Sequence, residues 1–116
     1  MKFNLKKPCK NCPFRKDSEK SWLGKGKAEG IAETITSGKG TFSCHKTTGV
    51  VEGVEVPQSK QSHCFGALQM LRNMDSLETG FIFQMAERLL SVSFEGIKKD
   101  FTICFENDTQ FIEHHT

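Results

Sequence analysis

The segment on which the predicted fold and site depend most runs from Lys7 to Lys16, KPCKNCPFRK. It contains two cysteines, Cys9 and Cys12, which are separated by two residues and flanked by lysines. A C-x-x-C turn lets two sulfur atoms reach one metal ion, while a disulfide or a redox-active pair is the competing interpretation. The compartment of the protein and the positions of its other cysteines decide between these interpretations.

Length and composition predict one compact domain over residues 1–116. The chain contains ten phenylalanines and no tyrosine, and Leu, Ile, Val and Phe together account for 28 of its 116 residues. This fraction of apolar residues is higher than in disordered chains. It predicts a folded domain with a small core, which an added cross-link would stabilise. We find no secretory leader and no stretch of the ~20 apolar residues that a membrane helix needs. We therefore expect a soluble cytoplasmic protein, in which cysteines bind metals more often than they form structural disulfides.

The apolar pattern predicts an α+β domain that is mostly helical, with a short antiparallel β element. Ala28, Ile31, Ala32 and Ile35 form one helical stripe, so we expect a helix over residues 25–36 that ends near Gly38. The other expected elements are strands over 41–44 and 101–105, a loose hairpin or mobile loop over 47–62, helices over 64–73 and 78–90, and a last helical turn capped by Asp108. In the helix over 78–90, we expect one apolar side made of Phe81, Ile82, Met85, Ala86 and Leu89.

Charge is distributed unevenly along the chain. Residues 1–46 hold eleven Lys or Arg and four Asp or Glu, whereas residues 47–116 hold five and ten. A basic segment can attract nucleic acid or an acidic protein. The basic residues lack interleaved aromatic residues and a recognisable nucleic-acid-binding motif, so we expect the lysines to solvate the surface and to offset nearby thiolates.

Two further cysteines complete a set of four candidate metal ligands. Cys44 lies in FSCHK and Cys64 in SHCFGA, so Cys9, Cys12, Cys44 and Cys64 come from three separate segments. Four thiolates suit a tetrahedral sulfur site, and one zinc ion is the preferred occupant. A [4Fe–4S] cluster is the alternative, because a proline follows a ligand cysteine in some ferredoxin motifs and Cys64 begins a helix.

Residues next to these cysteines are the alternative ligands or would donate hydrogen bonds to the ligands. His45 and His63 each adjoin a proposed ligand, and Arg15 follows the C-x-x-C motif closely enough to donate to thiolates. The fifth cysteine, Cys104, lies in the apolar segment FTICF, and we expect it to be a small buried side chain outside the metal site.

Four further residues, one aromatic and three basic, allow less specific predictions. Trp22 is expected to fill the core or to close over the metal loop, and its alternative role is to anchor a partner. Lys16 is a second candidate for partner contact. His114 and His115 lie close to the end of the sequence, and we expect them to be exposed to solvent.

The sequence argues against two catalytic roles for the cysteines, a thioredoxin-like redox pair and a hydrolase nucleophile. A thioredoxin-like redox pair follows a β-strand, and only eight residues precede Cys9. A cysteine hydrolase needs a free nucleophile beside a histidine, but His45 and His63 adjoin cysteines that resemble ligands. The sequence contains no glycine-rich phosphate loop, so we expect a binding protein rather than an enzyme.

Taken together, these motifs resemble a family of small cysteine-rich proteins from bacteriophages and prophages. The shared outline is CxxCPFR, WLG, FxCHK, CxGA and IEHH, found here at Cys9–Arg15, Trp22–Gly24, Phe42–Lys46, Cys64–Ala67 and Ile112–His115. The resemblance covers nearly the whole chain and includes the four proposed ligands, although Phe65 stands where a smaller residue is expected. It implies a phage-encoded protein of the host cytoplasm and brings no established activity.

The sequence as a whole favours a metal-stapled binding or regulatory module that acts on a host or phage macromolecule. A protein partner is expected, and nucleic-acid binding is expected to be weak. The first alternative is a redox-active iron–sulfur protein that serves as an electron carrier or sensor. The second alternative is a nucleic-acid-binding module that uses the basic half of the chain.

Overall fold

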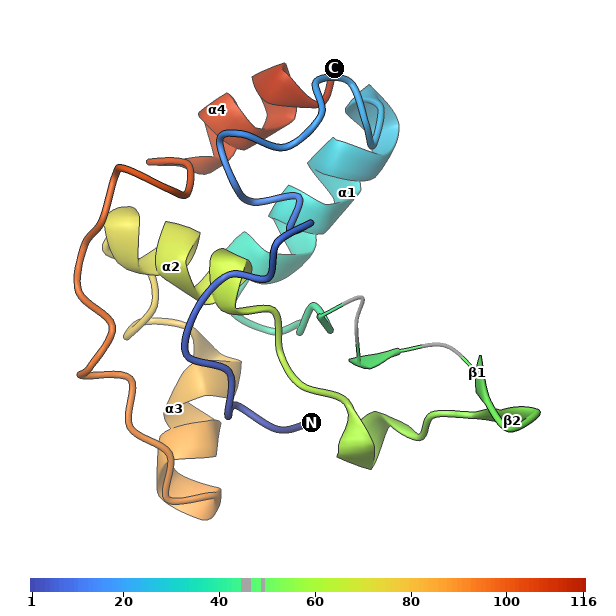
Figure 1. Ribbon diagram of the computed structural model, residues 1–116. Helices are drawn as coiled ribbons and strands as arrows, with labels where there is room; N and C mark the ends of the chain where they lie inside the picture. The colour runs from blue at the N-terminus through green and yellow to red at the C-terminus, as the bar shows by residue number, and fades with distance from the viewer. Residues whose placement is uncertain (45–46, 49) are drawn as a thin grey trace.

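The computed structural model describes residues 1–44, 47–48 and 50–116, with only the backbone described for Val50 and Val51. Within this part of the chain the fold is mostly helical, as predicted, and its extents are 37 × 34 × 22 Å (Figure 1). The elements in chain order are α1 (Lys25–Thr36), β1 (Val50–Val51), β2 (Val54–Glu55), the 3-10 helix η2 (Gln58–Lys60), α2 (Phe65–Asn73), α3 (Phe81–Leu89) and α4 (Asp108–His114). None of the described helices combines the length and the apolar character that crossing a membrane requires.

Helix α1 has the bounds that its apolar stripe predicts. Ala28, Ala32 and Ile35 are buried, and the helix packs against both α4 and α2. Figure 1 shows α1 and α4 side by side at one end of the molecule. The chain leaves α1 through Gly38, whose φ of +72° is a conformation that glycine adopts without strain. The carbonyl of Gly38 accepts a hydrogen bond from the Ile82 amide at 2.8 Å, so the end of α1 also fixes the start of α3.

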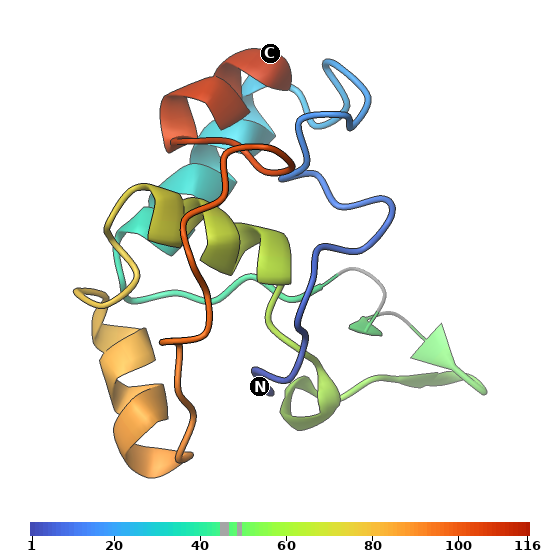
Figure 2. The same cartoon turned by 60° about the vertical axis from the view of Figure 1, so that its left-hand side comes forward.

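Helix α2 lies at the centre of the fold, beside the N-terminal loop (Figure 2). Its last residue, Asn73, is buried and connects it to the later part of the chain. The Asn73 side-chain amide donates to the carbonyls of Asp100 at 2.9 Å and Phe105 at 3.0 Å, and its oxygen accepts from the Asp100 amide at 2.9 Å. One side chain therefore fixes both ends of the segment that precedes α4.

The strand predicted over residues 101–105 is wrong. Residues 101–103 form a turn, and Cys104 makes a single antiparallel bridge with Arg15. Phe101 and Ile103 are exposed, whereas Cys104 is fully buried. The alternation of apolar residues was therefore misleading. The backbone of this segment pairs with residues 14–16 at the one bridge, and the Asn73 side chain binds the carbonyls of Asp100 and Phe105 at its two ends.

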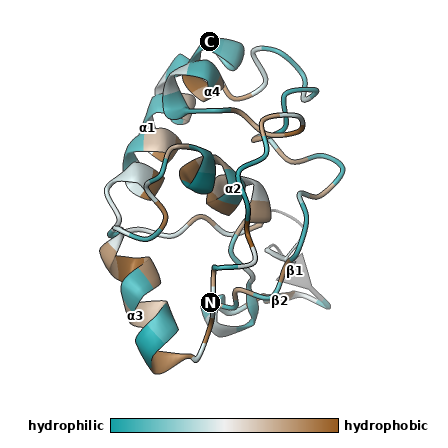
Figure 3. Ribbon diagram, turned by 90° about the vertical axis from the view of Figure 1, so that its left-hand side faces the viewer, coloured by the Kyte–Doolittle hydropathy of each residue, from teal (hydrophilic) through white to brown (hydrophobic). Residues whose placement is uncertain are grey.

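Helix α3 is shorter than the predicted range of 78–90, and it buries Ala86, as predicted, together with one residue outside the predicted side. Phe83 is fully buried and packs edge-on against Phe94, although it is not part of the predicted apolar side. Phe81 and Leu89 belong to that side, yet 61% and 72% of their surfaces are exposed. Apolar and polar residues both occur along this helix, as Figure 3 shows. The start of the helix lies against Gly38, more than forty residues earlier in the chain, and a periodicity argument does not include such a contact.

The hairpin predicted within residues 47–62 is present in its described part. Strands β1 and β2 are antiparallel, with Val50 opposite Glu55 and Val51 opposite Val54. Both turn residues, Glu52 and Gly53, have positive φ angles of 53° and 79°, as a type I′ turn requires. The hairpin projects away from the helices (Figure 1), and η2 follows it.

Helix α4 is capped by Asn107 and not by Asp108 as predicted. The Asn107 side chain accepts a hydrogen bond from the Gln110 amide at 2.9 Å, while Asp108 is the first helical residue. Asn107 is the residue with extended backbone angles, which is the conformation that N-cap residues adopt. The prediction was therefore one residue late.

Candidate metal centre

All four proposed ligands line one cavity of about 200 Å³. Cys12, Cys44 and Cys64 are buried, and Cys9 is half-buried. The cavity is bounded by the N-terminal loop, the segment that ends at Cys44 and the first residue before α2, so the structure brings together three segments that are far apart in the sequence.

The C-x-x-C segment forms a tight turn against α2. The Cys12 amide donates to the Cys9 carbonyl at 3.2 Å, and the Arg15 amide donates to the Cys12 carbonyl at 3.1 Å. Gly66, in the first turn of α2, leaves the space that this turn occupies. A Cβ atom at Gly66 would lie 2.5 Å from the Cys12 sulfur and 2.9 Å from Phe14 Cβ. The absence of a side chain at Gly66 therefore allows Cys12 to approach Cys64.

Backbone pairing places Cys44 beside Cys64. The Cys44 amide donates to the Ser62 carbonyl, and the Cys64 amide donates to the Phe42 carbonyl, each at 2.7 Å. These bonds frame a single antiparallel bridge between residues 43 and 63, and this bridge stands where a strand over 41–44 was predicted. The bridge holds the Cys44 backbone next to the N-cap of α2.

Cys12 and Cys64 are in direct sulfur contact, with 3.6 Å between their Sγ atoms. This hydrogen-bonded contact, together with burial, raises the pKa of the Cys12 thiol far above its usual range, so the thiol is protonated when no cation is present. Among the described residues, no three Cys, His, Asp or Glu side chains are arranged closely enough to hold one ion as they stand. The structure thus shows a shared cavity and one sulfur pair in contact.

The cavity walls are mainly apolar. Lys27 is the one cation among the described lining residues, and the other lining residues apart from the cysteines are Pro13, Trp22, Leu23, Ile31 and Phe42. Of the two positions expected for Trp22, the core is wrong, because 42% of its surface is exposed, and the residue lines the cysteine cavity instead. Trp22 thus lies between the cavity and solvent.

His63 is buried behind the cysteines and uses both ring nitrogens elsewhere. Its Nε2 atom accepts a hydrogen bond from the Phe42 amide at 3.3 Å, so its Nδ1 atom carries the proton and donates to the Cys64 carbonyl at 3.0 Å. Desolvation lowers the pKa of His63 to about 4, and its ring stacks on Phe3. His63 therefore acts on the site through the Cys64 backbone. The other histidine considered as a ligand, His45, lies outside the described residues.

The two basic residues after the C-x-x-C motif contact groups other than thiols. Arg15 binds both carboxylate oxygens of Asp17, at 2.9 and 3.0 Å. The Lys16 ammonium donates to the Phe101 carbonyl. These contacts tie the loop to neighbouring groups. In the hydrogen bonds described, the Arg15 guanidinium therefore binds the Asp17 carboxylate and not a thiol.

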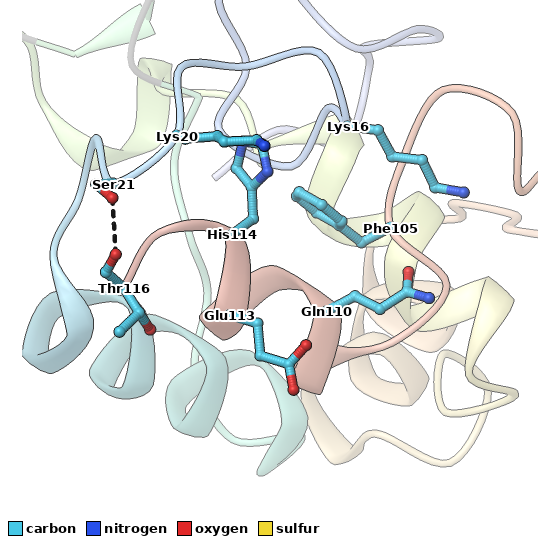
Figure 4. A pocket seen from close by; sticks show the side chains of 8 residues that line it. All are labelled: Lys16, Lys20, Ser21, Phe105, Gln110, Glu113, His114 and Thr116. Atoms are coloured by element: carbon cyan, nitrogen blue, oxygen red, sulfur yellow. Dashed lines mark hydrogen bonds between the residues drawn. The ribbon is translucent and has the colours of Figure 1, made fainter.

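The expectation that the last two histidines are exposed is wrong. His115 is fully buried, and its Nε2 atom donates to the Pro13 carbonyl at 2.7 Å. His114 is half-buried, and its Nε2 atom donates to the Ser18 carbonyl at 2.7 Å. Figure 4 shows His114 among the residues that line an open polar pocket beside this loop. Both histidines thus anchor the loop that follows the C-x-x-C turn, a pairing across about a hundred residues that no local pattern indicates.

Cys104 is buried, as predicted, and does not line the cysteine cavity. Burial, followed by the nearby Cys12 sulfur, raises the pKa of the Cys104 thiol to about 12. Its surroundings therefore suit a neutral thiol that packs as an apolar side chain.

Comparison with protein families, curated proteins and solved structures finds no similar protein.

Proposed function

We propose that this chain is a non-enzymatic binding module stabilised by one metal centre. The ligands are Cys9, Cys12, Cys44 and Cys64, and the preferred occupant is one zinc ion. The observation that carries the proposal is the convergence of these four cysteines, from three segments, on one cavity of about 200 Å³. Such a centre would link the N-terminal loop to the start of α2 in a chain whose core is small.

The contact between Cys12 and Cys64 supports a single ion. Zinc–sulfur bonds of about 2.3 Å in a tetrahedron place two thiolates roughly 3.8 Å apart, close to the 3.6 Å between these two sulfur atoms. A four-iron cluster attaches each cysteine to a different iron atom, which separates the sulfur atoms more widely. Lys27 at the cavity wall would offset part of the negative charge of four thiolates.

A [4Fe–4S] cluster is the alternative occupant, and with it a role in electron transfer or sensing. The observation that favours it is the volume of the cavity, which exceeds the space that a single ion needs. The apolar wall formed by Leu23, Ile31 and Phe42 is also an environment in which clusters are held away from solvent.

The described histidines give no sign of a base paired with a thiol. His63 uses both ring nitrogens in hydrogen bonds to backbone groups, and the hydrogen bonds described for His114 and His115 reach Ser18 and the Pro13 carbonyl and not a cysteine sulfur. A general base must lie within hydrogen-bond reach of the proton that it removes.

A protein with an acidic surface is the preferred partner. The N-terminal segment and the first turn of α1 carry six exposed lysines, of which Lys27 lines the cavity; they are Lys6, Lys7, Lys10, Lys20, Lys25 and Lys27. Half-exposed Trp22 offers an aromatic anchor among them. The resemblance to phage proteins supports the host cytoplasm as the setting.

Metal analysis of protein purified without oxygen tests this proposal. We expect about one zinc ion per chain in a colourless protein. A brown protein with about four iron atoms would establish the cluster in place of zinc. A folded protein that contains neither metal, and in which all five thiols react freely, would refute the metal centre.

A further inference from the structure

Cys12 and Cys64 form a contact pair within the set of four cysteines. Their sulfur atoms are 3.6 Å apart, although the residues are separated by 52 positions in the sequence. Both side chains are almost fully buried, with 1% and 3% of their surfaces exposed. Because Gly66 has no side chain, the Cys12 sulfur lies close against the first turn of α2, where Cys64 is the N-cap.

A small oxidant can reach this pair through the cavity. Cys12 and Cys64 both line the cavity of about 200 Å³, and half-buried Cys9 lines it as well. A molecule of water or hydrogen peroxide occupies a small part of that volume. Larger oxidants meet Trp22 and Phe42 in the wall.

We propose that Cys12 and Cys64 are an oxidation site that hydrogen peroxide converts into a disulfide with release of the bound ion. The release of the ion rests on the function proposed above, whereas the pairing of the two sulfurs rests on their contact alone. The new bond would link the N-terminal loop to the N-cap of α2 covalently, so it would replace the metal at the same point of the fold.

The chemistry balances with peroxide as the only oxidant. One thiolate attacks a peroxide oxygen, the O–O bond breaks, and hydroxide leaves as a sulfenic acid forms. The second thiolate attacks that sulfur, the S–S bond forms, and a second hydroxide leaves. Two sulfur atoms lose two electrons in total, and peroxide becomes two water molecules after protonation. Because two of the four ligands are lost, the ion is no longer held.

This pairing differs from the one that the sequence would favour. A C-x-x-C motif invites a bond between Cys9 and Cys12, which would close a short ring and leave α2 unconnected. The contact with Cys64 gives Cys12 a partner on another element that is already within about 4 Å. A disulfide forms between sulfurs about 2 Å apart, so the pair must close by less than 2 Å.

Mass spectrometry of the native metal-bound protein tests the pairing. The protein is treated with hydrogen peroxide, its free thiols are alkylated, and its peptides are mapped without reduction while a chelating dye records the released metal. We expect a peptide that links Cys12 to Cys64, release of about one ion per chain, and reversal of the link by dithiothreitol. A Cys104→Ser variant is the matched control, and it should give the same link.

The results of this experiment distinguish failure of the proposed disulfide from failure of the proposed metal centre. A link between Cys9 and Cys12, or retention of the metal with no link to Cys64, would overturn the inference and leave the metal centre intact. A native protein that holds no metal but still forms the Cys12–Cys64 link would refute the metal centre and support the pairing. The mapping uses the unsubstituted chain, so the result does not depend on whether a variant at Cys64 folds.

Discussion

Single cysteine replacements distinguish a ligand from a buried thiol. Serine at Cys9, Cys12, Cys44 or Cys64 should remove the metal or unfold the chain, because each replacement deletes one of four thiolates. Cys104→Ser should keep the full metal content and lower the free energy of unfolding by about 1–3 kcal/mol, the cost of burying a hydroxyl in an apolar site. Metal content per folded chain is the measurement, and Cys104→Ala is the control without a hydroxyl. Metal loss in both Cys104 variants would make Cys104 a ligand.

Burial of His115 makes stability depend on pH. Desolvation lowers the pKa of His115 in the folded state below its value of about 6.5 in the unfolded chain. The unfolded state therefore binds more protons at acidic pH, and the free energy of unfolding should fall as pH drops below about 6.5. Urea unfolding between pH 7.5 and 5 measures this slope.

His115→Gln is the variant that isolates this effect. Glutamine can donate to the Pro13 carbonyl, as the histidine does, but it does not titrate. His63, whose pKa is lowered to about 4, contributes a slope of the same sign and is unchanged in the variant. We therefore expect a shallower slope in His115→Gln, and equal slopes in the two proteins would contradict the role given to His115.

At the scale of elements, the packing of the C-x-x-C turn on α2 depends on Gly66. Gly66→Ala would place a Cβ 2.5 Å from the Cys12 sulfur, so the turn or the helix must move. We expect a loss of about 1–3 kcal/mol in the free energy of unfolding, typical of overpacking, together with weaker metal binding. Chemical unfolding and competition with a chelating dye measure the two effects.

Gly30→Ala is the matched control for this change. Gly30 lies inside α1, and a Cβ there would meet no atom within 4 Å. Because alanine favours a helix more than glycine does, the control should stabilise the fold by about 0.5–1 kcal/mol and leave metal binding unchanged. Similar effects from both substitutions would show that the close approach of Cys12 to α2 is not required.

The elements that the sequence predicts correctly are those whose burial follows their own periodicity. In α1, three of the four residues of the predicted stripe are buried and the fourth, Ile31, is partly buried against the core, so a local pattern was sufficient. Residues 101–105 pair with the N-terminal loop at a single bridge, and the Asn73 side chain binds the carbonyls on either side of it, those of Asp100 and Phe105. The apolar side predicted for α3 is confirmed at Ala86, whereas Phe81 and Leu89 are exposed and Phe83 is buried instead. In both cases packing against distant parts of the chain, which local periodicity does not include, contributes to which residues are buried.

The same distinction applies to the candidate site. The chemistry of cysteine and the C-x-x-C spacing identify residues that share one cavity. Sequence spacing does not identify Cys12 and Cys64 as the pair in contact, because that contact depends on how the N-terminal loop packs on α2 at Gly66. Nor does it indicate that His115 supports the loop, since the histidine and Pro13 are 102 positions apart.

At the scale of the whole molecule, metal removal should weaken the entire fold. The proposed centre joins the N-terminal loop to α2, and α2 is in turn linked to the segment before α4 through Asn73. A chelator in reducing buffer should lower the melting temperature by more than about 10 °C, because structural zinc sites contribute several kcal/mol to folding. The control is the same chelator saturated with zinc. An unchanged melting temperature after verified metal loss would contradict the stabilising role.

Charge distribution determines which partner the whole molecule can bind. Exposed lysines crowd the N-terminal loop, whereas residues 47–116 carry ten acidic and five basic residues. A duplex that wrapped the molecule would meet this acidic part, which limits its contact to one side. We expect non-specific DNA binding no tighter than about 10⁻⁵ M at physiological salt, falling steeply as salt rises because neutralised phosphates release counterions. A gel-shift titration at several salt concentrations measures it. Tight binding that is lost when Lys6, Lys7 and Lys10 are replaced by glutamate would make nucleic acid, and not an acidic protein, the partner of this surface.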